Sequence, residues 1–398
     1  MLKILLSLIF IRPFISSLAF PYLNLVHSFL LLIFLFIWFI YKGISIRKIQ
    51  PLKYPLALLC LALIISIVFS IDKLNSLKEL YKYASGLFLF LIVASLNDED
   101  KIRVISVIIL SGFIISLLAI YQYFFGFRHV LEYLVRDNSF ISTFALDYLE
   151  RKRVFFPFVT PNTLAGYLAM IIPLALTLGR KNRIWFIIPL SFALLLTKSL
   201  GALLSLFFAL GLYFYLSRPC AQERDLQGKL EKKKVVFLFG LLIIIGLVFM
   251  ARATTQKQHF QPIFSTTMRL NYWKDTLKII KAKPLTGIGL GNFNLEQSRY
   301  AHNSYLQIWA EMGILGIMSF LWILISVFKS TFQNIKVSSC KKLAFSQDFY
   351  HKKQIAGLLT ANVVFLIHNL VDFSFFLPEV SLIWWVTFGL ILSFKFNQ

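Results

Sequence analysis

Residues 184–216 read IWFIIPLSFALLLTKSLGALLSLFFALGLYFYL, a run of 33 residues in which Lys198 is the only charge. Basic residues close both ends of the run, Arg180 and Arg183 before it and Arg218 after it. Because short loops rich in lysine and arginine stay on the cytoplasmic side of a membrane, both ends should lie on that side and the number of crossings should be even. The run therefore predicts two short transmembrane helices, with TKSLGA as the turn on the outer side.

The composition of the whole chain also indicates a membrane protein. Of 398 residues, 58% are hydrophobic, 42 are phenylalanine and only 15% are charged. A soluble domain of this length does not bury so much apolar surface. The apolar blocks are roughly 15 to 25 residues long, which suits helices that cross about 30 Å of hydrocarbon, whereas barrel strands would be shorter and alternating. We therefore expect an all-α, polytopic bundle of membrane helices that forms one integral membrane domain over residues 1–398.

Twelve candidate spans follow from the positions of the apolar blocks. They cover residues 4–20, 22–41, 54–71, 80–96, 102–124, 157–178, 184–197, 199–216, 235–251, 302–328, 355–371 and 380–396. Arg12 and Pro13 interrupt the first block, which is therefore either a full crossing or an interfacial or broken helix. The first block lacks a small-residue cleavage site, so it is not interpreted as a removed signal peptide.

The formal net charge of +23 is explained by topology, and no nucleic-acid partner is expected. Basic residues crowd four connections, represented by Lys42 to Lys53, Arg180 to Arg183, Arg218 to Lys234 and Lys329 to Lys353. With the spans above, all four connections lie on one side, which is then cytoplasmic, and both termini join it if the first block crosses. Cys60 falls in a span and the other two cysteines in cytoplasmic loops, so no disulfide framework is offered to the outer face.

Two outer loops are long, residues 125–156 and 252–301. The second loop contains an expected helix over about 266–282, followed by a turn punctuated by Pro284, Gly287, Gly289 and Gly291. Arg269 and Trp273 are four residues apart and should share a face of that helix. The glycines allow the backbone to turn tightly and to approach a ligand or neighbouring helices.

The second loop leads into AHNSYLQIWAEMGILG, residues 301–316. On a helix, Asn303, Ser304, Gln307 and Glu311 fall on one side, and His302 falls on another with Leu306, Trp309 and Gly313. The uninterrupted hydrocarbon run begins only at Ile314, so His302 should lie at or just outside the outer interface. Asn303 is a candidate helix cap, which would leave free N–H groups facing the outer space.

Three stretches together carry a resemblance to a known family. They are TPNTLAGYLAMIIPLAL at 160–176, RLNYWKDTLKIIKAKPLTGIGLGNF at 269–293 and HNSYLQIWAEMGILG at 302–316. In order and topology the chain resembles the O-antigen ligase family, which includes O-antigen polymerases and protein O-oligosaccharyltransferases. The family's histidine motif is matched by His302, Asn303 and Gly313.

The resemblance implies a glycosyltransferase of the bacterial inner membrane that acts in lipopolysaccharide biosynthesis. Its donor would be a glycan on undecaprenyl diphosphate, and its acceptor a sugar of the lipid A core or a growing glycan, at the periplasmic face. Arg269 matches the family's loop arginine, and its planar fork suits a diphosphate. His302 would serve either as the base for the acceptor hydroxyl or as a donor to the phosphates. Membrane lipids are the remaining expected partner.

Further positions follow from the same match. Arg153 resembles the family's arginine before the pair Pro161 and Asn162, while His368 and Asp372 resemble residues near the outer rim. Trp273, Asn303 and Gly313 would support the site. The family's Ser-Arg-Gly turn has Leu200 in place of its arginine here, and Lys198 is the nearby cation that could contact the carrier phosphates as a point charge.

No metal and no other cofactor is expected, because the histidines are scattered and no carboxylate pair has ligand spacing. Two alternatives stay open beside O-antigen ligation. One is a polymerase of the same superfamily that makes O-antigen or exopolysaccharide. The other is a transporter or flippase, which would place ionisable groups near the membrane midplane, whereas several spans here carry no charge. A non-catalytic scaffold of the cell envelope is a third possibility that Leu200 leaves open.

Overall fold

The structure is a computed structural model that describes residues 1–43, 50–129, 148–217, 227–254, 264–340 and 346–393. Within these ranges all regular elements are helical, and the bridge between Leu295 and Ser298 is isolated. The α-helices are α1 (Leu2–Ile11), α2 (Pro21–Lys42), α4 (Lys53–Val68), α5 (Lys73–Ser95), α6 (Asp98–Tyr121), α9 (Pro161–Ala175), α10 (Arg180–Leu196), α11 (Leu200–Leu216), α12 (Gln227–Thr254), α13 (Phe264–Ala282), α14 (Ser304–Cys340), α15 (Ser346–His368) and α16 (Pro378–Ser393). The expectation of an all-α polytopic membrane protein is confirmed.

Within the described residues, four helical segments are long and apolar enough to cross a membrane, by length and composition: Pro21–Lys42, Gln50–Val68, Asp98–His129 and Ser304–Gln333. Shorter apolar helices include Pro161–Ala175, Asn182–Leu196, Leu200–Leu216, Leu238–Met250 and Pro378–Leu392. A helix lies in each of the twelve candidate spans, but the number of crossings stays a prediction. The two helices expected from residues 184–216 are present as α10 and α11, with Lys198 in the turn at a φ of 54°.

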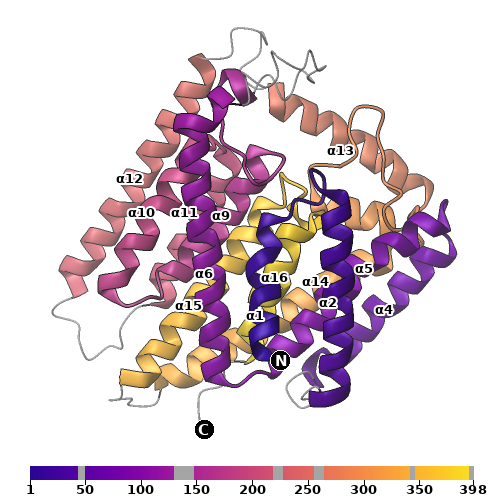
Figure 1. Ribbon diagram of the computed structural model, residues 1–398, viewed down its shortest axis with the longest axis horizontal. Coiled ribbons are helices and arrows are strands. Elements are labelled where there is room, and N and C mark those ends of the chain that lie inside the picture. The colour runs from indigo at the N-terminus through magenta and orange to yellow at the C-terminus, as the bar shows by residue number, and fades with distance from the viewer. Residues whose placement is uncertain (44–49, 130–147, 218–226, 255–263, 341–345, 394–398) are drawn as a thin grey trace.

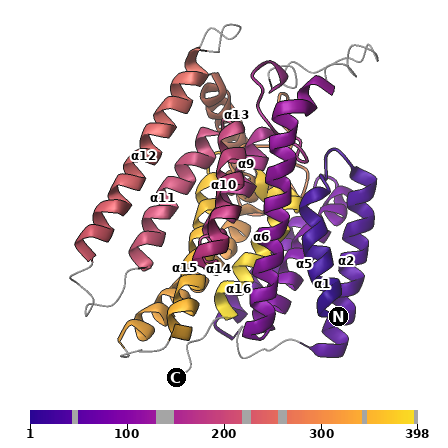
Figure 2. The same ribbon diagram turned by 60° about the vertical axis from the view of Figure 1, so that its left-hand side comes forward.

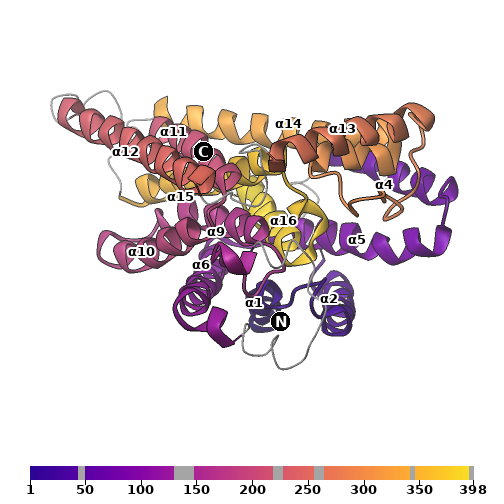
Figure 3. The ribbon, with the colours of Figure 1, turned by 90° about the horizontal axis from the view of Figure 1, so that it is seen from above.

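The bundle is built around α16, whose residues are almost all buried. This helix packs against α5, α14 and α15, and Figure 3 shows it near the centre of the molecule when seen from above. Trp384 and Trp385 are buried on α16, where Trp384 stacks on Phe365 and Phe388. This pair therefore packs the core. Figure 1 shows α12, α10 and α11 on one flank and α4 and α5 on the other, and Figure 2 shows α12 and α11 on the flank opposite α1 and α2.

The two ends of the bundle differ. In Figure 1, α13 lies across the upper end, whereas the N-terminus and the end of α2 lie at the lower end. We call the upper end the α13 end. The helix α13 belongs to the long outer loop predicted over residues 252–301. The basic connection that follows α2 begins at the opposite end, as the charge pattern predicts.

The first apolar block is a broken helix. The helix α1 stops at Ile11, and a 3₁₀ turn, η1 (Arg12–Phe14), follows it. Arg12 is buried, and its Nη2 donates to Asn24 Oδ1 at 2.8 Å and lies 3.4 Å from Glu379 Oε2 on α16. A buried charge needs such partners, so the break at Arg12 is stabilised by a contact between the two ends of the chain.

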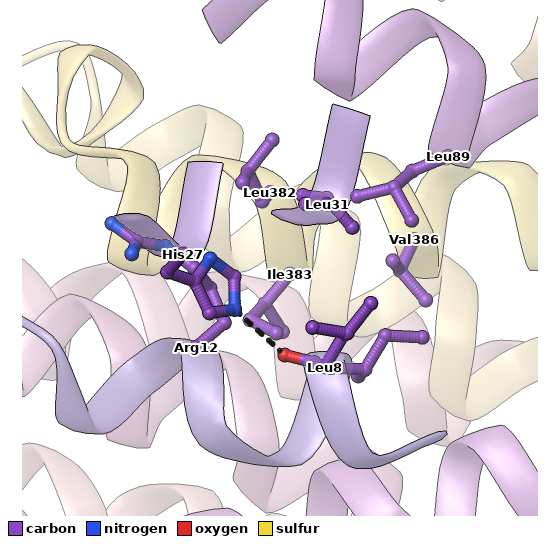
Figure 4. Close-up of a pocket in the computed structure, with 9 residues that line it drawn as sticks. Leu8, Arg12, His27, Leu31, Leu89, Leu382, Ile383 and Val386 are labelled. Atoms are coloured by element: carbon purple, nitrogen blue, oxygen red, sulfur yellow. Dashed lines mark hydrogen bonds between the residues drawn. The ribbon is translucent and has the colours of Figure 1, made fainter. Parts of the chain in front are cut away.

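A small cavity lies beside this break (Figure 4). It is lined mainly by aliphatic residues of α1, α2, α5 and α16, with Arg12 and His27 at its edge. His27 Nε2 lies 3.2 Å from the carbonyl oxygen of Leu8. None of the lining residues is one of the site residues expected from the sequence, so this cavity is separate from the candidate site.

The helix α14, which lies in the candidate span 302–328, is not continuous. Gly313 has φ 66° and ψ −169°, which interrupts the helix one turn below its most polar stretch. The turn from Pro284 to Gly291, which we call the glycine turn, pairs with the backbone on both sides of the break. Ile288 N donates to Ala310 O at 2.9 Å, Gly289 N to Glu311 O at 3.0 Å, and Ile314 N to Pro284 O at 2.9 Å. The groups that a straight helix would pair internally are therefore satisfied by the turn.

Candidate functional site

His302 lies at the α13 end, two residues before the start of α14, and has an unusual backbone. Its φ is 52°, in the left-handed region that non-glycine residues rarely adopt. Its ring stacks on Tyr272 of α13, with centroids 5.5 Å apart and planes at 20°, and meets the Phe373 ring edge-on at 4.8 Å. Nδ1 of this imidazole is buried and has no hydrogen-bond partner. A strained backbone, such as the left-handed φ of His302, is often found at functional sites.

Polar residues at the start of α14 fix the position of His302. Asn303 Oδ1 accepts from the N–H groups of Tyr305 and Leu306 at 3.0 and 3.1 Å, so the expected helix cap is confirmed. Ser304 donates from its N and Oγ to the backbone and side-chain oxygens of Asn369. The segment is thereby held against the end of α15.

Two further polar residues of α14, Gln307 and Glu311, also hold the segment around His302 in place. Gln307 Oε1 accepts from Ala301 N at 3.1 Å, immediately before His302. Gln307 Nε2 donates to Glu311 Oε1 at 2.9 Å, and Glu311 Oε2 accepts from Gly291 N at 3.0 Å. These residues satisfy neighbouring loops, as the helical spacing predicts, and connect the glycine turn to the His302 segment.

The charges around His302 come from α13 and from the segment after α15. Burial lowers the pKa of His302 to about 4, the nearby Asp372 carboxylate opposes this shift, and Arg269 reinforces it. Burial also lowers the pKa of Arg269, again opposed by Asp372. The three groups thus lie within electrostatic reach of one another, and the imidazole is neutral near pH 7.

Asp372 is fully buried and connects His302 with His368. Burial alone would raise the pKa of Asp372, but the combined effect of His368, Ser374 and His302 holds it well below its usual value. Its Oδ2 accepts from Ser374 N at 3.2 Å and lies 3.4 Å from His368 Nε2, and its Oδ1 has no partner. The carboxylate is therefore ionised beside two imidazoles.

His368 is wedged between α9 and α11. A Cβ added to Gly166 would overlap the His368 ring, and one added to Gly201 would lie 3.6 Å from Nδ1. His368 Nε2 also lies 3.2 Å from the carbonyl oxygen of Asn162. Two glycines on different helices thus make room for this side chain.

Arg153 extends the network to the turn between α10 and α11. Its Nε donates to Thr197 O at 2.9 Å and its Nη2 to Asn162 Oδ1 at 3.0 Å, while its guanidinium lies over the Tyr148 ring. Pro161 occupies the first turn of α9, directly before Asn162. The structure therefore brings Arg153, Pro161, Asn162, His368 and Asp372 together as expected.

Lys198 completes a group of four cations. Its Nζ donates to Arg151 O at 2.6 Å, and its pKa is lowered by burial and by the positive charges of Arg153, Arg151 and Lys152. We call these four residues the cationic cluster. The Tyr148 ring lies under Arg153 and interacts electrostatically with Arg269, so the cluster continues toward α13.

Leu200, in place of the family's arginine, is the first residue of α11. It is partly buried and packs against the hydrophobic core. Position 200 therefore carries no charge, and the positive charges near this turn come from Lys198 and Arg153.

Trp273 lies on α13, and the glycine turn follows the end of that helix. Trp273 is half-buried, and its Nε1 is buried and lacks a partner. A Cβ on Gly287 would overlap the backbone of Glu311, and one on Gly291 would overlap Glu79. The close approach expected of these glycines is therefore to neighbouring helices and their side chains.

Sequence reasoning missed two aromatic residues that enclose His302. Tyr272 lies one turn from Arg269 on α13, and Phe373 directly follows Asp372. Both lie close in sequence to predicted site residues, and this proximity could have identified them. Aromatic residues are frequent throughout this chain, however, so the signal does not stand out. Among the described residues, no group of three His, Cys, Asp or Glu side chains has the geometry to hold a metal ion.

An all-helical membrane protein with a neutral histidine, an arginine and a carboxylate at one end has the groups that a transferase needs at a membrane surface. Residues 184–321 match the family model described as O-antigen ligase, which covers α10 to the first half of α14. This part of the chain is therefore similar to the O-antigen ligase family. No curated protein and no solved structure matches it. Arg153, His368 and Asp372 lie outside the matched residues. Within them, Arg153 donates to Thr197, His368 lies beside Gly201, and Asp372 is within electrostatic reach of His302.

Proposed function

We propose that the chain transfers a glycan from an undecaprenyl diphosphate carrier to an acceptor hydroxyl at the periplasmic face of the inner membrane, as an O-antigen ligase does with the lipid A core. The observation that supports this most directly is the placement of a strained, neutral His302 with an unpartnered Nδ1 beside Arg269 and Asp372. The match of residues 184–321 to the O-antigen ligase model supports the general class of glycan transfer.

In the proposed reaction, the acceptor oxygen attacks the anomeric carbon of the donor sugar. The bond from that carbon to the diphosphate oxygen breaks, and undecaprenyl diphosphate leaves with the electron pair. The proton of the acceptor hydroxyl passes to the imidazole of His302, which the Asp372 carboxylate then stabilises as a cation. Arg269 and the cationic cluster balance the charge that develops on the diphosphate, so the reaction is proposed to need no metal.

The product of a reconstituted reaction tests this proposal. Purified protein in lipid vesicles is supplied with a lipid-linked glycan and with lipopolysaccharide core as acceptor. Ligation gives core that carries the glycan and runs more slowly on a gel. If the carrier-linked glycan instead grows by repeat units while the core stays unmodified, the chain is a polymerase and the assignment to ligation is wrong.

Replacing Arg269 should weaken transfer more than removing another cation of the same helix. We expect Arg269→Ala to lower the transfer rate by about 100-fold, because one charged donor to the transition state is lost. Arg269→Lys should recover only part of this loss, since lysine lacks the planar fork. Lys274→Ala, an exposed cation of α13, is the matched control and should keep the wild-type rate. Equal rates for Arg269→Ala and Lys274→Ala would remove Arg269 from the mechanism.

The pH dependence separates the two roles considered for His302. As a base, the imidazole must be neutral, and with a pKa of about 4 it stays neutral as pH falls from 7 to 5.5. The transfer rate should therefore change little over this interval, whereas a histidine with its ordinary pKa of about 6.5 would lose about tenfold. A rate that rises on acidification would instead indicate a protonated histidine that donates to the phosphates. Single-turnover rates over this range, with His302→Ala as reference, give the answer.

A further inference from the structure

A second cavity lies between α10, α11 and α15, at the end of these helices far from His302. It has a volume of about 230 Å³ and is lined by Arg183, Tyr213, Ser217, Lys352 and Lys353. Three of the five lining side chains are cationic, two carry hydroxyl groups and none is acidic. One water occupies about 30 Å³ of the liquid, so the cavity has room for a phosphate group with several waters.

The positive charges of this cavity are held close together. Lys353 Nζ donates to the carbonyl oxygen of Leu178 at 3.2 Å, which fixes the ammonium group at the end of α9. Burial, and then the nearby Arg183, lower the pKa of Lys353. An anion between these groups would relieve both the repulsion and the desolvation.

Exposed side chains beside the cavity indicate its depth. Trp185 of α10 is 76% exposed and Tyr215 of α11 is 62% exposed, and such aromatic rings gather where hydrocarbon meets headgroups. Ile184 and Ile188 are also mostly exposed on α10, so this level of the helix presents an apolar surface that suits acyl chains. The cavity therefore combines cationic and hydroxyl-bearing lining residues with exposed aromatic and aliphatic side chains at the same level of α10 and α11.

We propose that this cavity binds the phosphate of an anionic phospholipid headgroup from the cytoplasmic leaflet. Arg183 supplies a planar pair of donors, the two lysines supply point charges, and the hydroxyls of Tyr213 and Ser217 complete the set. Basic pockets between membrane helices on the cytoplasmic side are suited to such headgroups. The aromatic and aliphatic flank favours a lipid over free phosphate. This site is independent of the proposed transfer reaction.

Native mass spectrometry of the full-length protein tests the proposal. Protein in detergent is exposed to phosphatidylglycerol or phosphatidylcholine, and retained lipid is counted. We expect phosphatidylglycerol to be retained preferentially, and the double variant Arg183→Gln with Lys353→Gln to lower its affinity by about tenfold, as for the loss of charge-assisted hydrogen bonds. The control double variant, Lys42→Gln with Lys53→Gln, removes the same charge from α2 and α4. It should change the affinity by less than about twofold.

Each other outcome overturns the proposal. Equal losses in the two double variants would mean a general attraction to the basic end of the protein. Equal retention of the two lipids by the wild-type protein, a measurement that needs no variant, would exclude an anionic headgroup site. Displacement of the bound lipid by inorganic phosphate at millimolar concentration would identify a free-phosphate site. Unfolding temperatures show whether the variants remain folded.

Discussion

Replacing His302 by alanine is expected to lower the rate of glycan transfer by about 1,000-fold, while the amount of protein in the membrane stays normal. A positioned base contributes about 100-fold to 10,000-fold, and the stack between Tyr272 and Phe373 gives the imidazole one defined orientation. The initial rate of transfer in reconstituted vesicles, normalised to protein, is the measurement.

The backbone at His302 calls for a second variant. At φ 52° an alanine is strained, so His302→Ala changes both the side chain and the backbone preference. Asparagine tolerates the left-handed region, and His302→Asn should therefore preserve the local fold but lose transfer to the same extent. His129→Ala removes an exposed histidine at the end of the helical segment Asp98–His129 and should transfer at the wild-type rate. A His302→Asn variant with full activity would disprove the role of the imidazole.

Gly313→Ala should destabilise the protein by at least about 3 kcal/mol, from backbone strain and overpacking together. With φ 66° and ψ −169°, Gly313 occupies a region that is essentially restricted to glycine. An added Cβ would also overlap the Leu285 carbonyl and lie 2.8 Å from Thr286 N, and backbone atoms cannot rotate away as a side chain does. The unfolding temperature in detergent should fall sharply.

Gly211→Ala is the matched control for this change. Gly211 lies within α11, and a Cβ there would meet no atom within 4 Å. Alanine also has the higher helix propensity, so this variant should be as stable as the wild type or slightly more stable. If Gly313→Ala unfolded at the same temperature as Gly211→Ala, the break in α14 would not depend on a glycine.

Local patterns in the sequence were sufficient for the elements and for some of their ends. Hydrophobic length and the basic flanks predicted α10 and α11 as a pair, because both signals are contained in one short stretch. The cap at Asn303 and the helix that carries Arg269 also depend on neighbours within a few residues. For the same reason, the polar stripe of α14 was correctly assigned to contacts with loops.

The arrangement of the site depends on contacts between residues far apart in the chain. The break at Gly313 forms because the backbone of Ile288 and Gly289 pairs with carbonyls of α14, and the periodicity of α14 alone favours a straight helix. His368 occupies a space left by Gly166 and Gly201, two glycines that look unremarkable on their own helices. The resemblance indicated which residues belong together, but not that Tyr272 and Phe373 enclose the imidazole.

The break in α14 has a mechanical consequence. Residues before Gly313 are hydrogen-bonded to the glycine turn, while the uninterrupted hydrocarbon run begins at Ile314. A bilayer that becomes thinner or thicker tilts the helices that it contacts. Because Ile314 N, below the break, donates to Pro284 O, the glycine turn holds both parts of α14. We therefore expect a change in the tilt of the lower part to act on the turn that follows α13, so that the thickness of the membrane is coupled to the geometry of the candidate site.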